Sequence, residues 1–219
     1  SKNKIIKLYR EEGYFLAKVD ASMEPIDKKN SQRNNVTFTI NEGKKMKIKD
    51  IIISGTGQNN FGWLATKSWL PIPKIIRNKL SLYTLRRQLK DTKIRTWWRF
   101  WASSFDKKKF DDDLVALNSF YKDEGHRDFT VLSDSVFYNK KKRGLVVQIS
   151  VNEGVQYKFR NFSWEGNSLY EEQILQTTLN LKKGDIFNQS GFDKAVFQDV
   201  QSLYMDRGYL YSNIEPFFT

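Results

Sequence analysis

The sequence predicts an α+β fold made of repeated modules, each with the order strand, helix, helix, strand, strand. Three segments share an apolar helical face, then a Tyr four residues before a Gly, then a strand-like run: 5–19, 116–131 and 200–214. Two strand-like runs with alternating apolar residues follow the first two of these segments. Repetition at a fixed spacing indicates a tandem array rather than one large core.

The helix before each shared glycine is best supported in the second copy. Its apolar residues recur at i, i+4, i+7 and i+11, as one face of a helix requires: Phe110, Leu114, Leu117 and Tyr121. Glycine adopts positive φ without a steric cost, so it commonly ends a helix in a left-handed turn. We expect this role for the glycine of each copy: Gly13, Gly125 and Gly208.

Two blocks that follow these helices predict pairs of strands. Val36, Phe38 and Ile40 alternate with polar residues, and Val147, Ile149 and Val151 do the same, which indicates strands with one buried face. In both blocks Asn-Glu-Gly follows as a turn. Further strands are expected at 47–53 and 158–164.

The spacing of the motifs divides the chain into modules. Gly13 to Gly43 is 30 residues and Gly125 to Gly154 is 29. The next interval differs between the copies: Gly55 to Gly125 is 70 residues, whereas Gly166 to Gly208 is 42. Aligning the tripeptide Ser-Leu-Tyr assigns most of the excess to an insertion at about 57–80 and a few residues to RTWWRFW, 95–101. The expected domains are the end of a module at 1–44, a complete module at 45–153, and a module at 154–219 that is truncated before its last strand.

Charge is concentrated in one segment. The net charge is +12, yet 44–110 alone carries 17 Lys/Arg and three acids, and it also holds five of the six tryptophans. A basic, Trp-rich segment indicates contact with a polyanion, such as anionic lipid, an acidic protein face or nucleic acid.

Catalytic alternatives have weak support. With no Cys, thiol catalysis and thiolate metal sites are excluded. The single histidine, His126, occupies the position of a Tyr in the other copies, so a structural or surface role is expected. Gly55-x-Gly57-x-x-Asn60 lacks the third glycine of a dinucleotide fingerprint. Asp111, Asp112 and Asp113 are expected to favour the N-terminal dipole of a helix. We expect no catalytic, cofactor or metal site.

The repeat resembles the POTRA module of BamA-like outer-membrane protein assembly factors. The likeness rests on the β-α-α-β-β order, on Tyr-x-x-x-Gly-Tyr at the second helix end, and on Asn-Glu-Gly leading into FRNFSWEGN at 159–167. It covers nearly the whole chain except about 58–80. It implies tandem modules, each with a three-stranded mixed sheet packed against two helices. RDF and SDSVFY after Gly125, and TWWRFW, are most similar to the Bacteroidota branch.

This resemblance implies a periplasmic scaffold without enzymatic activity, tethered to the outer membrane through a C-terminal β-barrel that this chain does not contain. The implied partners are unfolded outer-membrane proteins and accessory lipoproteins. They would bind partly by adding a strand to an exposed sheet edge, which makes little demand on sequence. The POTRA region of a TamA-like or two-partner secretion translocator is the alternative.

In this family the exposed edge is the strand after the second helix. Here it is expected at 14–21, 129–137 and 209–217, and Pro216 would limit pairing in the last. The implied strand-edge residues of the complete module are Phe129, Thr130, Val131, Leu132, Ser133, Asp134, Ser135, Val136 and Phe137.

The Trp-rich segment has three interpretations: packing inside its module, contact with the periplasmic leaflet of the outer membrane, and binding of a partner protein. The candidate contact residues are Trp63, Trp69, Arg95, Trp97, Trp98, Arg99, Phe100 and Trp101. A nucleic-acid-binding protein is the alternative of a different class, but there is no RNP-type strand, zinc spacing or recognition helix, so no nucleic acid is expected.

Overall fold

The computed structural model describes residues 2–27, 30–56, 82–94, 104–141 and 143–218. The chain divides into two compact units, one made of 1–117 with 131–151 and the other of 118–130 with 152–219. Helix α4, Lys107–Asp123, begins in the first unit and ends in the second.

The first unit opens with a helix and a two-stranded sheet. Helix α1, Lys2–Glu11, precedes β1, Lys18–Asp27, which pairs antiparallel with β2, Asn30–Asn41. The expectation that β2 has a buried face is wrong: Val36, Phe38 and Ile40 are 47%, 39% and 39% exposed. In the described part of the chain no third strand or helix layer covers this face, and burial requires such a layer.

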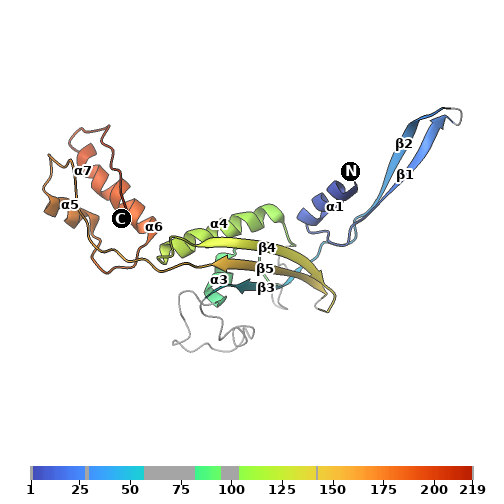
Figure 1. Ribbon diagram of the computed structural model, residues 1–219, viewed down its shortest axis with the longest axis horizontal. Helices are drawn as coiled ribbons and strands as arrows, with labels where there is room; N and C mark the ends of the chain where they lie inside the picture. The colour runs from blue at the N-terminus through green and yellow to red at the C-terminus, as the bar shows by residue number, and fades with distance from the viewer. Residues whose placement is uncertain (1, 28–29, 57–81, 95–103, 142, 219) are drawn as a thin grey trace. The chain divides into compact units, whose positions relative to one another are not determined.

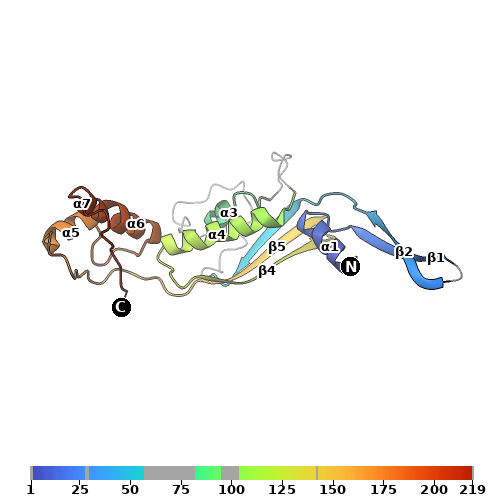
Figure 2. The same ribbon diagram turned by 90° about the horizontal axis from the view of Figure 1, so that it is seen from above.

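A complete β-α-α-β-β module follows along the chain, and most of it belongs to the first unit. Its elements in order are β3, Ile48–Ser54; α3, Leu82–Gln88; α4; β4, Thr130–Asn139; and β5, Gly144–Asn152. The sheet order is β3-β5-β4, with β3 parallel to β5. In Figure 1 β4 runs opposite to β5, which makes the sheet mixed. Figure 2 shows α3 and α4 on one face of this sheet. The predicted fold class is confirmed.

The core of this module lies between the sheet and the two helices. Val147, Ile149 and Val151 of β5 are at most 2% exposed, which confirms the predicted buried face. Buried residues from the other elements meet them: Ile48, Ile51, Ile53, Leu85, Leu89, Phe110 and Leu117. Asp113 is also buried, and its carboxylate accepts hydrogen bonds from the backbone N–H of Asp91 and of Thr92. Asp113 therefore holds the α3–α4 connection. The dipole role expected for Asp111, Asp112 and Asp113 is wrong, because α4 begins at Lys107 and has no acidic residue in its first turn.

The second unit is mainly helical in its described part. It contains α5, Glu172–Leu179, and a continuous helical run made of α6, Gln189–Lys194, the π-helical η3, Ala195–Val200, and α7, Gln201–Met205. Its core joins these helices through buried residues: Leu175, Leu179, Phe187, Phe192, Ala195, Val196 and Val200.

Regular strands expected in the second unit do not form. Residues 209–217 have no strand, and 158–164 has only an isolated antiparallel bridge between Lys158 and Ile186. A strand is stabilised by neighbouring strands, and neither segment has a ladder partner among the described residues.

The three shared glycines end their helices as predicted. Gly13, Gly125 and Gly208 have φ of 91°, 91° and 84°. In each case the residue after the glycine donates its N–H to the carbonyl of the motif tyrosine: Tyr14 to Tyr9 at 2.8 Å, His126 to Tyr121 at 2.9 Å, and Tyr209 to Tyr204 at 3.0 Å. This is the hydrogen bond of a Schellman turn.

Among the described residues, no helix combines the length and apolar character needed to cross a bilayer.

Candidate functional site

The candidate site is the outer edge of β4. In the sheet order β3-β5-β4, β4 has one strand neighbour, so the backbone groups along its other side have no strand partner in the described part of the chain. Thr130 to Phe137, expected on an exposed strand edge, all lie within β4. Phe129 precedes the strand and is 2% exposed, so its side chain anchors the start of β4 in the interior.

The side chains of β4 leave this edge accessible. Leu132 is 65% exposed and Phe137 is 41% exposed, and the two serines between them are also exposed. The strand contains no proline, so each residue keeps its N–H donor. Its one charged side chain, Asp134, is paired with Lys107 of α4 at 3.4 Å. The edge therefore carries one carboxylate, which is paired, together with exposed apolar side chains, and this suits an extended apolar-polar segment.

Tyr121 fixes the start of β4. Its ring stacks on Phe129 with centroids 4.0 Å apart and meets His126 edge to face at 5.8 Å. Its hydroxyl donates to Oε1 of Glu153 at 2.8 Å. Burial, and secondly this hydrogen bond to Glu153, raise the pKa of Tyr121 far above its usual value, so the hydroxyl remains a donor at neutral pH. His126 is 7% exposed, and its Nδ1 lies 3.1 Å from the Glu153 carbonyl oxygen.

A similar tyrosine–glutamate contact occurs in the first copy of the repeat. Tyr9 donates to Oε1 of Glu42 at 2.9 Å, and this glutamate belongs to the other Asn-Glu-Gly turn. The two glycine carbonyls also have matching partners, the N–H of Met46 on Gly13 at 3.0 Å and the N–H of Tyr157 on Gly125 at 2.9 Å. The Tyr-x-x-x-Gly motif and the Asn-Glu-Gly turn therefore contact each other in both copies. We call this contact, Tyr9–Glu42 in the first copy and Tyr121–Glu153 in the second, the Tyr–Glu joint.

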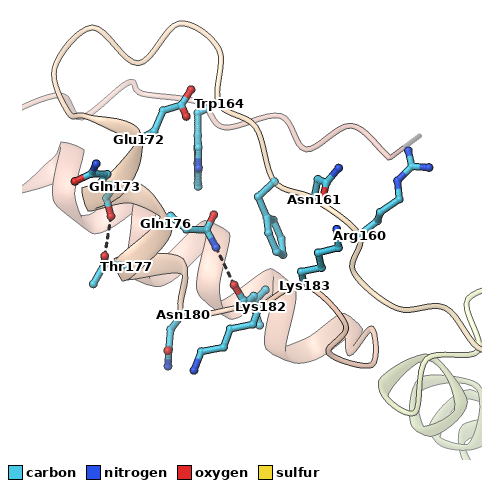
Figure 3. Close-up of a pocket in the computed structure, with 12 residues that line it drawn as sticks. Arg160, Asn161, Trp164, Glu172, Gln173, Gln176, Thr177, Asn180, Lys182 and Lys183 are labelled. Atoms are coloured by element: carbon cyan, nitrogen blue, oxygen red, sulfur yellow. Dashed lines mark hydrogen bonds between the residues drawn. The ribbon is translucent and has the colours of Figure 1, made fainter.

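A cavity of about 860 Å³ lies in the second unit, between α5 and the segment 160–164. Figure 3 shows the residues that line it, with hydrogen bonds from Gln176 to the Leu181 carbonyl, 2.8 Å, and from Thr177 to the Gln173 carbonyl, 2.7 Å. The indole N–H of Trp164, which also lines it, is buried and has no partner among the described residues. The wall includes the cations Arg160, Lys182 and Lys183.

The lining of this cavity carries one acidic side chain. Glu172 is its one carboxylate, so its lining offers no pair of acids for general acid–base catalysis. Within the described ranges no group of three or more His, Cys, Asp or Glu side chains is arranged to hold a metal ion. Asp111 instead pairs with Lys107 at 2.6 Å.

The predicted lipid or partner contacts lie outside the described residues. These are Trp63, Trp69, Arg95, Trp97, Trp98, Arg99, Phe100 and Trp101.

Two features around β4 were not predicted from the sequence. The pairing of Tyr121 with Glu153 joins residues 32 positions apart, although both belong to motifs that recur together. The β4–β5 turn NKKKRG, 139–144, is a visible cluster of cations whose position beside β3 required the structure.

Comparison with known proteins gives matches along the chain. The family model "Surface antigen variable number repeat" (POTRA) matches residues 1–43 and 157–216. The outer membrane protein assembly factor BamA of Neisseria meningitidis serogroup B is 26% identical over 215 residues, covering 97% of this chain and 24% of that protein. BamA of Buchnera aphidicola is 24% identical over 188 residues, covering 84% and 27%. The chain thus spans about a quarter of the length of these relatives.

Solved structures also align with the chain. POTRA domains 3–5 of Haemophilus influenzae BamA give a TM-score of 0.43 at 17% identity, covering 97% of this chain and 70% of that one. The N-terminal domain of Omp85 from Thermosynechococcus elongatus gives 0.38 at 14% identity, covering 94% and 71%. The complete module has the β-α-α-β-β order, the POTRA family model matches two parts of the chain, and the similarity to BamA covers 97% of the chain. The chain is therefore similar to the POTRA domains of the BamA/Omp85 outer-membrane assembly factors.

Proposed function

We propose that this POTRA region works in the periplasm as the receiving scaffold of an outer-membrane protein assembly machine. POTRA domains of this family are scaffolds without enzymatic activity. In this proposal unfolded outer-membrane proteins bind as added strands, and accessory lipoproteins dock on the same array. A TamA-like or two-partner secretion parent would use the same surface for a different client. A Bacteroidota origin stays a prediction.

The open edge of β4 carries this proposal. An unpaired edge supplies N–H and C=O groups to any extended chain, so many clients can bind with little sequence specificity. The exposed Leu132 and Phe137 can contact alternate side chains of such a client, as in other strand-addition complexes. The start of β4 is held by the stacking of Phe129 on Tyr121, so the strand is presented in an ordered form.

The division into modules at 1–44, 45–153 and 154–219 is part of the proposal. It is supported by the Tyr–Glu joint, because the same contacts occur at the end of the first segment and at the end of the second. Repeated joints are expected where modules follow one another in an array.

A client peptide with alternating apolar residues tests strand addition directly. Binding of a fluorescent peptide of about ten residues, a common strand length, is measured by anisotropy. The peptide is then N-methylated at single positions. We expect methylation at every second residue to abolish binding and at the intervening residues to be tolerated, because only alternate N–H groups face the edge of β4. Equal tolerance at all positions would contradict strand addition.

A matched pair of substitutions locates the binding to β4. Leu132→Lys places a charge on the edge and should weaken peptide binding by about tenfold or more, since edge lysines discourage strand pairing. Leu210→Lys, at a residue of similar exposure, 68% against 65%, is the control and should leave binding unchanged. An equal effect of both substitutions would show that binding depends on overall charge.

The Trp-rich segment is proposed to contact the periplasmic leaflet of the outer membrane. Trp favours the bilayer interface and Lys/Arg favour anionic lipid. Alanine at Arg95, Trp97, Trp98, Arg99 and Trp101 together is expected to reduce flotation with anionic liposomes at low ionic strength. Unchanged flotation of this variant would exclude the segment as a lipid contact.

A further inference from the structure

The tip of the β4–β5 hairpin is a concentrated cationic surface. The turn sequence is NKKKRG, 139–144, and the described side chains of Lys140, Lys141 and Arg143 are exposed. Arg143 has a positive φ of 49°, and its N–H bonds the Lys140 carbonyl at 3.3 Å, so the turn is compact. Three described cations are therefore held within one tight turn.

Strand β3 adds a further cation to this turn. The N–H of Leu145, directly after the turn, bonds the Lys47 carbonyl at 2.9 Å. Gly144 lies so close to β3 that a Cβ built on it would collide with Cγ of Lys49 and would meet the Lys47 carbonyl oxygen at 2.7 Å. The start of β3 and the hairpin turn thus lie side by side, as Figure 1 also shows. We define the tip patch as Lys49, Lys140, Lys141 and Arg143.

These charges are not neutralised within the described part of the chain. None of the four tip-patch residues forms an ion pair there. Asp50, which follows Lys49 in β3, pairs with Arg86 at 3.5 Å, and Asp134 of β4 pairs with Lys107 at 3.4 Å. Four adjacent like charges repel one another, and that cost is relieved when an anion binds.

Protection of the sheet edge does not explain the tip patch. Edge strands often carry lysines that prevent unwanted pairing. Here β4, Thr130–Asn139, contains no Lys or Arg, and the cations gather after it, in the turn. The edge is left open while the tip is charged, so the two surfaces have separate roles.

The composition of the tip patch favours a lipid surface over a protein partner. Its four members are long cationic side chains, and none is aromatic or aliphatic. Protein interfaces have a desolvated centre that is rich in aromatic residues and depleted in lysine. A bilayer with anionic headgroups instead offers many mobile phosphates, and flexible lysines at a turn can contact these in any arrangement.

We propose that the tip patch docks this module on an anionic phospholipid surface by contacting headgroup phosphates. This inference deepens the proposed function, since it rests on the periplasmic position beside the outer membrane. It assigns lipid contact to residues separate from the Trp-rich segment. Docking at the hairpin tip would leave the β4 edge free to receive a client strand.

Vesicle flotation of the whole chain tests the proposal. Phosphatidylcholine vesicles with a minority of phosphatidylglycerol are compared with pure phosphatidylcholine at low and at physiological salt. The tip variant is Lys140→Gln with Lys141→Gln and Arg143→Gln. Each cation near an anionic surface raises binding about fivefold, so this variant should bind about a hundredfold more weakly. Binding of the parent chain should fall with added salt and be absent on the neutral vesicles.

A charge-matched variant serves as the control. Lys158→Gln with Lys194→Gln and Arg207→Gln removes three exposed cations from the second unit and should retain most of the vesicle binding. Equal losses in both variants, or unchanged flotation of the tip variant, would overturn the proposal. Retained flotation of the tip variant with lost binding of an acidic peptide would assign the patch to a protein partner instead.

The β4 peptide assay separates this inference from the proposed function. The tip variant should bind the client peptide as tightly as the parent chain, because it leaves β4 intact. If the parent chain does not bind the client peptide, the scaffold proposal is contradicted. If the tip variant floats like the parent chain, only the tip-patch proposal is contradicted. Circular dichroism of each variant confirms that its fold is retained.

Discussion

Tyr121 shows at the scale of one residue how a short motif specifies structure. Its carbonyl accepts the N–H that ends α4, its ring packs on Phe129, and its hydroxyl binds Glu153. The sequence predicts the first of these contacts, because the spacing of Tyr and Gly follows helix geometry. It cannot predict the third, since no local rule links residues 32 positions apart.

Removing the Tyr121 hydroxyl tests the Tyr–Glu joint. Tyr121→Phe should lower the free energy of unfolding by about 1–2 kcal/mol, because a part-buried hydrogen bond to a carboxylate is lost. Tyr9→Phe removes the exposed counterpart and should cost less than about 0.5 kcal/mol. Urea unfolding of both variants measures the difference. An equal cost for the two would contradict the dependence on burial.

Tyr121 also makes the free energy of unfolding depend on pH. Burial first, and Glu153 second, raise the pKa of Tyr121 in the folded state above the ordinary value of 10.0. The folded state therefore keeps this proton when the unfolded state loses it, and stability falls as pH rises above about 10. Tyr121→Phe should flatten part of that fall in urea titrations between neutral and strongly alkaline pH. An unchanged slope would mean that Tyr121 does not contribute.

Two glycines with the same φ allow the cost of a left-handed backbone to be measured separately from the cost of side-chain crowding. Gly125 and Gly184 both have φ of 91°, but a Cβ on Gly125 would meet Cγ2 of Ile186 at 2.8 Å, whereas Gly184 has nothing within 4 Å. Gly184→Ala should cost about 1–2 kcal/mol from the left-handed backbone alone. Gly125→Ala should cost more, because the crowded side chains must also move. Thermal unfolding that gave equal costs would contradict this packing.

At the scale of elements, α4 is the best-predicted part of the fold. Its apolar periodicity gave the buried face, and Phe110, Leu117 and Tyr121 are all fully buried. Strands were harder to predict, because a strand depends on its neighbours as well as on its sequence. β2 and β5 have similar alternation, yet Val147 is buried and Val36 is exposed. The pattern predicts which face can be buried, and the presence of a covering layer decides whether it is.

The acidic triplet 111–113, which follows the first turn of α4, gives a prediction at this scale. Asp113→Ala should destabilise the chain by about 1–3 kcal/mol, since it leaves the buried N–H of Thr92 without its acceptor. The neighbouring Asp112 is exposed, and Asp112→Ala should change stability by less than about 0.5 kcal/mol. Urea midpoints of the two variants provide the comparison. Equal midpoints would contradict a stabilising role for the hydrogen bonds that the Asp113 carboxylate accepts.

At the scale of the whole molecule, the internal repeat predicted more than any single motif. The recurrence of Gly13 and Gly125 with the two Asn-Glu-Gly turns gave the module order before any contact was known. The candidate edge at 129–137 was implied by the family resemblance, and its residues 130–137 lie within β4. The tip patch did not follow, because only the pairing of β3 with β5 brings Lys49 beside the turn.

Amide hydrogen exchange along β4 is the most direct test of the scaffold account. In the free chain, alternate amides of 130–139 should exchange slowly because they face β5, and the intervening amides should exchange rapidly. On binding a client peptide, the rapid set should become protected, giving continuous protection along the strand. Unchanged exchange in β4 upon peptide binding, or protection confined to the cavity beside α5, would contradict the account.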